Sequence, residues 1–136
     1  MTASLARGVA LAFALGFVGS AEAAVPDWSK WADLQTVEVI SVDEGGRPRT
    51  TTVWIVVVDG QPYLRTGRTT WGGNVEREGK LKLKGGPGVH ELRIEKVTDP
   101  SIQEKVMAAF RAKYGTWDRV SGLMRFGARR IFRLSE

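Results

Sequence analysis

The sequence contains no cysteine and only one histidine among its 136 residues. Without cysteine the chain can form no disulfide, no thiolate metal site and no cysteine nucleophile. A closed zinc site needs about four ligands, which one histidine without cysteines does not supply. We therefore expect no metal centre. His90 can titrate near neutral pH and can ligate metals, but a lone histidine is more typical of a surface or core position.

Common catalytic and nucleotide-binding motifs are also missing. No serine stands in a Gly-x-Ser-x-Gly elbow, and no carboxylate is spaced to orient the histidine, which argues against a catalytic triad. No pair of carboxylates is spaced for general acid–base chemistry. The chain has neither a Gly-x-Gly-x-x-Gly motif between a strand and a helix nor a Walker A lysine motif. These absences exclude the two common nucleotide-binding signatures, but not every nucleotide ligand.

One long apolar run is present, over residues 8–18. Arg7 precedes it and the triplet Ala21-Glu22-Ala23 follows it, which is the order of a positive start, an apolar core and a cleavage site. The run is shorter than the roughly 20 residues that cross a bilayer. We predict a signal peptide over 1–23, a single domain over 24–136, and a periplasmic or secreted product with no membrane span. An uncleaved membrane anchor is the alternative.

The chain is basic, with 20 Lys and Arg against 15 Asp and Glu and a formal net charge of +5. Such a surface attracts anionic ligands, nucleic acid or anionic surfaces. Because export separates the protein from cellular nucleic acid, we expect a small anionic ligand and no nucleic-acid partner. A solvated basic surface without any partner is the open alternative.

The residue pattern predicts mostly strands. β-branched residues indicate strands over 36–42 and 49–58, and the apolar second half of the latter suggests burial on both faces. Asp59-Gly60 predicts a hairpin into a strand over 62–66. Residues 80–84 alternate lysine and leucine, which is the pattern of a half-buried strand. Further strands are expected over 89–97 and 129–134.

Helices are expected at the periphery of these strands. Asp27 can cap a short helix that holds Trp28 and Trp31, two side chains that we expect to cover a core. Asp99-Pro100 is a favourable helix start, and Gly115 is a favourable end. A short helix or turn is expected over 71–78, and a further helix over 117–125.

Short strands joined by tight turns, without helices between the early ones, favour antiparallel pairing over parallel βαβ units. We predict an α+β, mainly β fold: a six-stranded antiparallel sheet or barrel with two or three peripheral helices.

The segment 63–74 combines groups that bind phosphate. Arg65 and Arg68 offer planar N–H donors, and the neighbouring hydroxyls and the backbone N–H groups of a helix start can complete an anion site. Trp71 can stack on a planar ring. The alternative is a polar hairpin exit in which Trp71 plugs the core.

Several motifs occur in an order that resembles a known family. The stretch 46–66 holds Gly46-Arg47-Pro48, Trp54 and the Asp59-Gly60 hairpin, and Trp71 with Asn74 matches a W-x-x-N-like helix. Residues 109–115 resemble an A-x-x-x-K-Y-G helix end, and 131–134 resembles a final strand. Over roughly residues 35–135 the chain resembles the FMN-binding split-barrel superfamily, which includes pyridoxamine-phosphate-oxidase-like and deazaflavin-dependent nitroreductase-like proteins.

The resemblance implies a split β-barrel that binds FMN or a deazaflavin, with the cofactor phosphate held where a strand enters a loop. It also implies a homodimer that shares its cofactor sites across the interface. Matched residue by residue, the cofactor-binding positions implied are Arg49, Arg65, Thr66, Arg68, Thr69, Thr70, Trp71 and Asn74.

Three functions are compatible with these observations. The first is a flavin- or deazaflavin-dependent oxidoreductase of unknown substrate, in which the cofactor supplies the hydride chemistry. The second is a non-catalytic exported protein that binds haem, a flavin or another planar anionic ligand. The third is a cofactor-free interaction domain, because fold resemblance does not itself confer activity.

Overall fold

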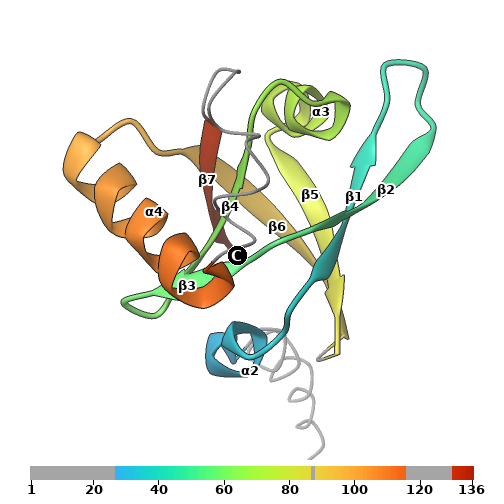
Figure 1. Cartoon of the computed structure of the whole chain (residues 1–136). Helices are drawn as coiled ribbons and strands as arrows, with labels where there is room; N and C mark the ends of the chain where they lie inside the picture. The colour runs from blue at the N-terminus through green and yellow to red at the C-terminus, as the bar shows by residue number, and fades with distance from the viewer. Residues whose placement is uncertain (1–26, 87, 116–129) are drawn as a thin grey trace, which may run out of the picture.

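A curled, seven-stranded antiparallel sheet forms the centre of the computed structural model, which describes residues 27–86, 88–115 and 130–136 (Figure 1). The strands are β1 (Val37–Val42), β2 (Pro48–Val53), β3 (Val56–Val58), β4 (Gln61–Thr66), β5 (Lys80–Gly85), β6 (Gly88–Lys96) and β7 (Arg130–Ser135). The helices are α2 (Trp28–Ala32), α3 (Thr70–Glu78) and α4 (Pro100–Tyr114). The predicted signal peptide and the helix predicted over 117–125 lie outside the described residues.

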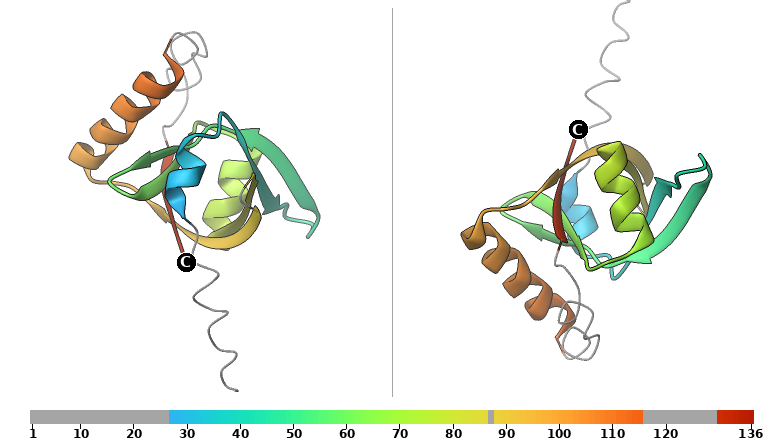
Figure 2. Two further views of the ribbon diagram at one scale, coloured as in Figure 1. Left: turned by 90° about the horizontal axis from the view of Figure 1, so that it is seen from below. Right: turned by 90° about the horizontal axis from the view of Figure 1, so that it is seen from above.

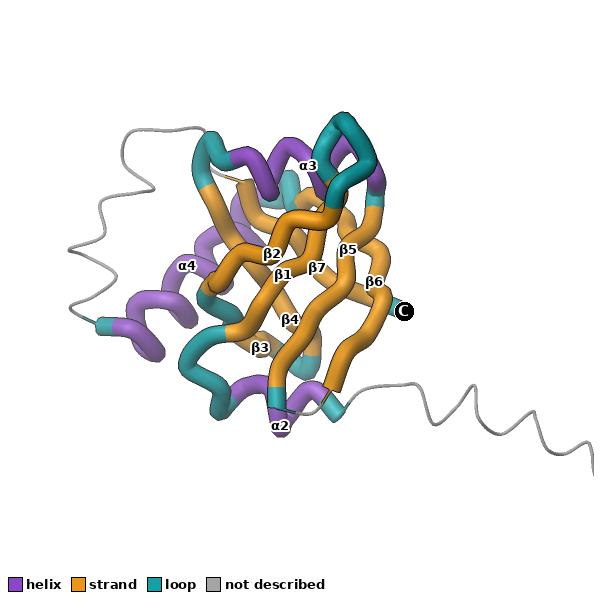
Figure 3. The backbone as a smooth tube through the Cα atoms, turned by 90° about the vertical axis from the view of Figure 1, so that its right-hand side faces the viewer, coloured by secondary structure: helices purple, strands orange, loops and turns teal. Residues whose placement is uncertain are grey.

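The sheet closes on itself through the segment that contains β2 and β3. The strand order is β2-β1-β5-β6-β7-β4-β3, so the two edge strands are consecutive in the chain. Only Trp54 and Ile55 separate them, and this short connection joins the two edges of the curled sheet (Figure 3). The result is the predicted split barrel of mainly β, α+β class.

The strand predicted over 49–58 is therefore two strands, and the predicted count of six is wrong by one. The reason lies in α4. The backbone N–H of Ile55 donates to the Tyr114 hydroxyl at 3.0 Å, and the carbonyl oxygen of Ile55 accepts from Lys113 Nζ at 2.7 Å. Side chains of α4 thus replace a strand partner at Ile55, and its backbone N–H and carbonyl groups stay paired where the chain leaves one sheet edge and joins the other.

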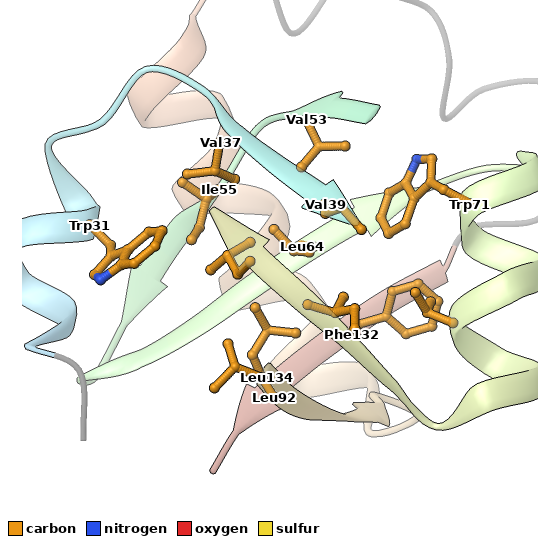
Figure 4. Packing of buried hydrophobic residues seen from close by; sticks show 13 residues of the cluster. Trp31, Val37, Val39, Val53, Ile55, Leu64, Trp71, Leu92, Phe132 and Leu134 are labelled. Carbon is orange, nitrogen blue, oxygen red and sulfur yellow. The ribbon is translucent and has the colours of Figure 1, made fainter. Parts of the chain in front are cut away.

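The barrel interior holds the larger of two apolar clusters, and a tryptophan lies at each end of it (Figure 4). Trp31 enters from α2 and is fully buried, whereas Trp71 enters from α3 and is 5% exposed. Between them lie side chains from every strand except β3, including Leu64 and Phe132. The expectation that Trp28 and Trp31 cover a core is confirmed, since partly buried Trp28 packs against the same cluster.

The second apolar cluster lies between the barrel and α4, which runs along the side of the barrel while α2 and α3 cross its two ends (Figure 2). Strands β4 and β7 contribute to both clusters because their side chains alternate between the two faces. Tyr63 and Ile131 face α4, while Leu64 and Phe132 face the interior. Double-sided burial is also confirmed next to β3, where Ile55 belongs to the interior cluster and Val56 to the α4 cluster.

Local signals in the sequence are confirmed at several turns and caps. Asp59 and Gly60 both have positive φ angles, 52° and 77°, which is the geometry of the tight hairpin that this dipeptide favours. Asp27 and Asp99 cap α2 and α4 by accepting hydrogen bonds from backbone N–H groups two residues later. In β5 the leucines are buried and the lysines are exposed, as the alternation predicts.

Candidate functional site

A pocket of about 200 Å³ opens beside the connection that closes the barrel. We call it the seam pocket. It lies where the end of β2, the end of β4 and the start of α3 meet, so three segments that are separate in the chain contribute to it. Its lining residues are Thr52, Val53, Trp54, Arg65, Thr66, Thr69 and Trp71.

Arg65 supplies the positive charge of this wall. Its guanidinium carbon lies 4.3 Å from the centroid of the Phe110 ring and 5.8 Å from that of Trp54. Its Nη1 atom also lies 3.6 Å from the sulfur of Met107. Cation–π contacts of this kind hold a guanidinium in place while its charge is retained. The structure therefore keeps an oriented cation beside the pocket.

Thr66 and Thr69 form a hydroxyl pair at the edge of the pocket, with their Oγ1 atoms 2.8 Å apart. Thr69 Oγ1 also accepts a hydrogen bond from the backbone N–H of Gly72 at 3.1 Å, which makes Thr69 the N-cap of α3. Two hydroxyls carry two protons, and the bond between them uses one. Because neither hydroxyl donates to another group among the described residues, the pair can donate one hydrogen bond to a ligand.

Two tryptophans line the seam pocket in different ways. Trp71 belongs to the barrel core, with its ring 6.0 Å from that of Phe132 and edge-on to it. Trp54 is half-buried and stacks on Tyr114, with ring centroids 4.1 Å apart and an interplanar angle of 5°. Trp71 therefore plugs the core, as one of the two interpretations of this residue expected, and it also lines the pocket wall.

Space under the first turn of α3 is tightly filled. A Cβ atom added to Gly72 would lie 2.8 Å from Arg130 Nη1, 2.8 Å from Thr66 Cγ2 and 2.9 Å from Thr69 Oγ1. Contacts this short force a neighbour to move, so only glycine fits without rearrangement. The missing side chain lets the guanidinium of Arg130 approach the hydroxyl pair from β7.

A second depression, of about 480 Å³, lies on the outer side of α3 and shares Thr69 with the seam pocket. Its centre is the Asp43 carboxylate, whose Oδ1 accepts from Arg49 Nε and from Asn74 Nδ2, each at 2.8 Å. These hydrogen bonds, Arg49 first and Asn74 second, lower the pKa of Asp43 below its ordinary value. Arg77 closes the network by donating to Asn74 Oδ1 and to the Val42 carbonyl oxygen.

The residues predicted to bind a cofactor are divided between these two places. Four of them line the seam pocket: Arg65, Thr66, Thr69 and Trp71. Arg49, Thr70 and Asn74 line the outer depression with Thr69. Asn74 is 4% exposed, and its amide ties α3 to β1 through Ser41 and Asp43, which is a structural role. Arg68 is exposed and lines neither place.

Sequence reasoning missed part of the seam pocket. The sequence predicts one long strand through Thr52, Val53 and Trp54 and no site in its middle, yet all three residues line the pocket. Trp54 does lie in the stretch that resembles the split-barrel proteins. Arg130 was assigned only to a closing strand. Arg130 lies near the site because it pairs with Thr66 of β4, and this pairing is known only from the sheet topology.

The chemistry available in the seam pocket is that of an anion site beside an aromatic ring. It offers a guanidinium, one hydroxyl proton and an indole, and the described residues that line it include no carboxylate, histidine or cysteine. Within the described segments, no three His, Asp or Glu side chains come close enough to hold a metal ion. None of the helices in that part of the chain combines the length and apolar character needed to span a membrane.

Solved structures similar to this one have split-barrel folds. The heme storage protein HutZ from Vibrio cholerae has a TM-score of 0.62 and 15% identity, covering 76% of this chain and 82% of its own. A FAD-binding protein from Mesorhizobium loti has a TM-score of 0.56 and 13% identity, covering 79% and 85%. A candidate pyridoxamine 5′-phosphate oxidase from Listeria innocua has a TM-score of 0.54 and 12% identity, covering 74% and 82%.

These likenesses confirm the predicted fold, and identities this low extend no further than the fold. A search of curated proteins found no match to the sequence. The family described as "uncharacterized protein conserved in bacteria" (DUF2255) matches residues 28–130. This chain is therefore a member of the DUF2255 family with a split-barrel fold.

Proposed function

We propose that this protein binds a planar, phosphate-bearing cofactor of the flavin or deazaflavin class in the seam pocket. The observation that carries the proposal is the convergence of three groups on one pocket: the oriented guanidinium of Arg65, the hydroxyl pair of Thr66 and Thr69, and the half-buried ring of Trp54. A phosphate needs the first two groups, and a planar ring system suits the third.

The donor set fits the phosphate end of such a cofactor. Arg65 is held in place by Phe110, and the Thr66–Thr69 pair has one proton left to donate. The first turn of α3 adds backbone N–H groups near the neutral cap Thr69, and a helix start favours negative charge. When bound, a flavin or deazaflavin would supply hydride chemistry, and the residues of the pocket would bind and orient it.

A homodimer is part of the proposal. The seam pocket measures about 200 Å³, which is below the 300–1,000 Å³ or so typical of complete small-molecule sites. We propose that a second copy of the chain contributes further contacts to this site. We further propose that the residues before Ala24 direct export and that the protein acts in the periplasm or outside the cell, as an oxidoreductase of unknown substrate.

A second candidate is non-catalytic binding of haem or another planar anionic ligand, which the likeness to the V. cholerae heme storage protein favours. The position of His90 argues for a flavin over haem in this pocket. Its ring lies 5.7 Å from Trp31, at the end of the barrel opposite Trp71 (Figure 4). A haem in the seam pocket would have to use another axial ligand.

The test is titration of the purified protein with FMN, deazaflavin and haemin, followed by absorbance and by quenching of cofactor fluorescence. Arg65→Met should weaken FMN binding at least about tenfold, equivalent to about 1.4 kcal/mol, because it removes a charge-assisted contact to phosphate. Arg68→Met is the matched control, since Arg68 lies three residues further on, is exposed and lines neither pocket. Equal losses in both variants would contradict the site. Absence of binding to all three ligands would favour the cofactor-free interaction domain.

A further inference from the structure

We propose that Arg130 is the residue that makes the seam pocket select doubly charged phosphate over uncharged or singly charged ligands. The inference rests on the proposed function above and extends it to a residue outside the pocket lining. Arg130 lies on β7 directly opposite Thr66 of β4, and its guanidinium packs beside the Thr66 and Thr69 side chains under the first turn of α3. It therefore acts through the pair and through its electric field.

The placement of Arg130 follows from three contacts around one point. The position that a Gly72 Cβ would occupy lies 2.8 Å from Arg130 Nη1, 2.8 Å from Thr66 Cγ2 and 2.9 Å from Thr69 Oγ1. The guanidinium and both threonines are thus packed around the first turn of α3. A ligand bonded to the spare hydroxyl proton would have this cation beside its hydrogen-bond donor.

The charge of Arg130 is only loosely compensated. Its Nη1 atom is buried and has no hydrogen-bond partner within the described part of the chain. The carboxylate paired with it, Glu76, lies at 3.8 Å and is also 3.0 Å from Lys96 Nζ. A buried N–H without a partner is costly. An anion in the neighbouring pocket would balance part of the charge of this guanidinium through its electric field, without accepting a hydrogen bond from Nη1.

Burial makes this charge effective at a distance. The Arg130 side chain is only 19% exposed, and a charge shielded from water interacts more strongly with its neighbours than an exposed one does. The attraction grows with the charge of the ligand, so a phosphate of charge near −2 gains more than a monoanion. Arg65 and Arg130 together would match this dianion, one at the wall and one beside the hydroxyl pair.

The experiment compares FMN with riboflavin, which has the same ring system without the phosphate. In the wild type we expect FMN to bind at least about tenfold more tightly. Arg130→Met keeps an unbranched apolar stem and removes the charge, so it should lower this preference about tenfold. Arg130→Lys restores the charge and should recover most of the preference. The ratio of the two affinities cancels any general loss of folded protein.

A second pair of variants tests the geometry. Gly72→Ala places a methyl group against Arg130 Nη1 and should reduce the FMN preference in the same direction. Gly73→Ala is its neighbour on α3 and meets no atom within 4 Å, so it should leave the preference unchanged. Both changes raise helix propensity equally, which separates the effect of crowding from any effect on α3 itself.

Each outcome has a defined meaning. If wild type binds FMN but Arg130→Met leaves the ratio to riboflavin unchanged, Arg130 is structural and the inference is overturned while the proposed function stands. If wild type binds neither flavin, the flavin proposal fails and inorganic phosphate becomes the probe. Phosphate should then raise the Tm of wild type more than that of Arg130→Met at equal ionic strength. Equal shifts would overturn the inference as well.

Discussion

A buried tryptophan closes each of the two ends of the barrel, but the residues around the two tryptophans differ. At each end a helix inserts a tryptophan into the interior cluster, Trp31 from α2 and Trp71 from α3. Around Trp31 the neighbours are close-packed: a Cβ on Gly85 would lie 2.7 Å from the Trp31 ring and 2.9 Å from Leu34. Around Trp71 lies the seam pocket, with Arg65 and two threonine hydroxyls.

The residues that cap the two helices also differ, in their charge. The N-terminus of α2 is capped by the Asp27 carboxylate, which neutralises the positive end of the helix, whereas α3 is capped by the uncharged hydroxyl of Thr69. The helix start at the α2 end thus carries a carboxylate, whereas the helix start at the α3 end carries an uncharged hydroxyl beside the seam pocket. The comparison shows that a buried tryptophan can close the end of a barrel whether or not a pocket lies beside it.

The largest expected effect is a loss of stability on replacing either tryptophan, and FMN affinity distinguishes Trp31 from Trp71. Trp31→Ala should lower the free energy of unfolding by about 3–5 kcal/mol, because it empties a fully buried indole site. Urea denaturation measures this loss. The affinity ratio for FMN over riboflavin should stay constant in this variant, since Trp31 lies at the end opposite the pocket (Figure 4). Trp71→Ala, which removes part of the pocket wall, should lower both stability and FMN affinity. A change of the ratio in Trp31→Ala would break the comparison.

A smaller effect tests how tightly the α2 end is sealed. Gly85→Ala should destabilise the protein by about 1–3 kcal/mol, because the new methyl group meets the rigid Trp31 ring. Its neighbour Gly86 is the control, since a Cβ there has only an ordinary contact of 3.6 Å with Leu34. Thermal unfolding of both variants measures the difference. Equal Tm values would mean that the α2 end has room to adjust and is less well packed than its contacts indicate.

The smallest effect concerns pH and the outer side of α3. Hydrogen bonds from Arg49 and Asn74 lower the pKa of Asp43 in the folded state. The folded protein thus binds this proton less readily than the unfolded chain, where the pKa is about 3.9. The stabilisation is fully present above that value and is lost as the pH falls through the lower folded-state pKa.

Asp43→Asn should therefore reduce stability slightly at neutral pH, and the difference from wild type should shrink at acidic pH. Urea midpoints measured across the acid range check this. Asp27→Asn is the matched variant at the other barrel end, because hydrogen bonds from Ser29 also lower the pKa of Asp27. A difference for Asp43→Asn that stays constant as the pH falls would show that the carboxylate does not hold the network together.

Much of the fold could be predicted because the relevant interactions are local. The alternation in 80–84, the hairpin at Asp59-Gly60 and the caps at Asp27 and Asp99 depend on neighbouring residues, and the structure has all of them. The break between β2 and β3 could not be predicted in this way. Its cause is Tyr114, which is 59 positions from Ile55 in the chain and bonds to its backbone.

The candidate site was predicted in part for the same reason. Arg65, Thr66, Thr69 and Trp71 lie within one continuous segment, so their polar pattern is visible in the sequence, and the structure brings all four to one pocket. Asn74 belongs to the same segment but faces Ser41 and Asp43, partners that only the packing of α3 on β1 supplies. Trp54 lies outside this segment, in the connection between β2 and β3, so its place in the pocket is not visible from the local pattern.

By itself, the sequence determined most of the strands, the capped helices and a cluster of cationic and hydroxyl side chains, because periodicity, turn chemistry and local composition act over a few residues. The tertiary structure alone decided that β2 and β3 would close the barrel and that Arg130 would lie opposite Thr66. It also decided that the seam pocket would form at the Trp71 end of the barrel. Those features depend on strand register and side-chain packing between distant segments, which no local pattern encodes.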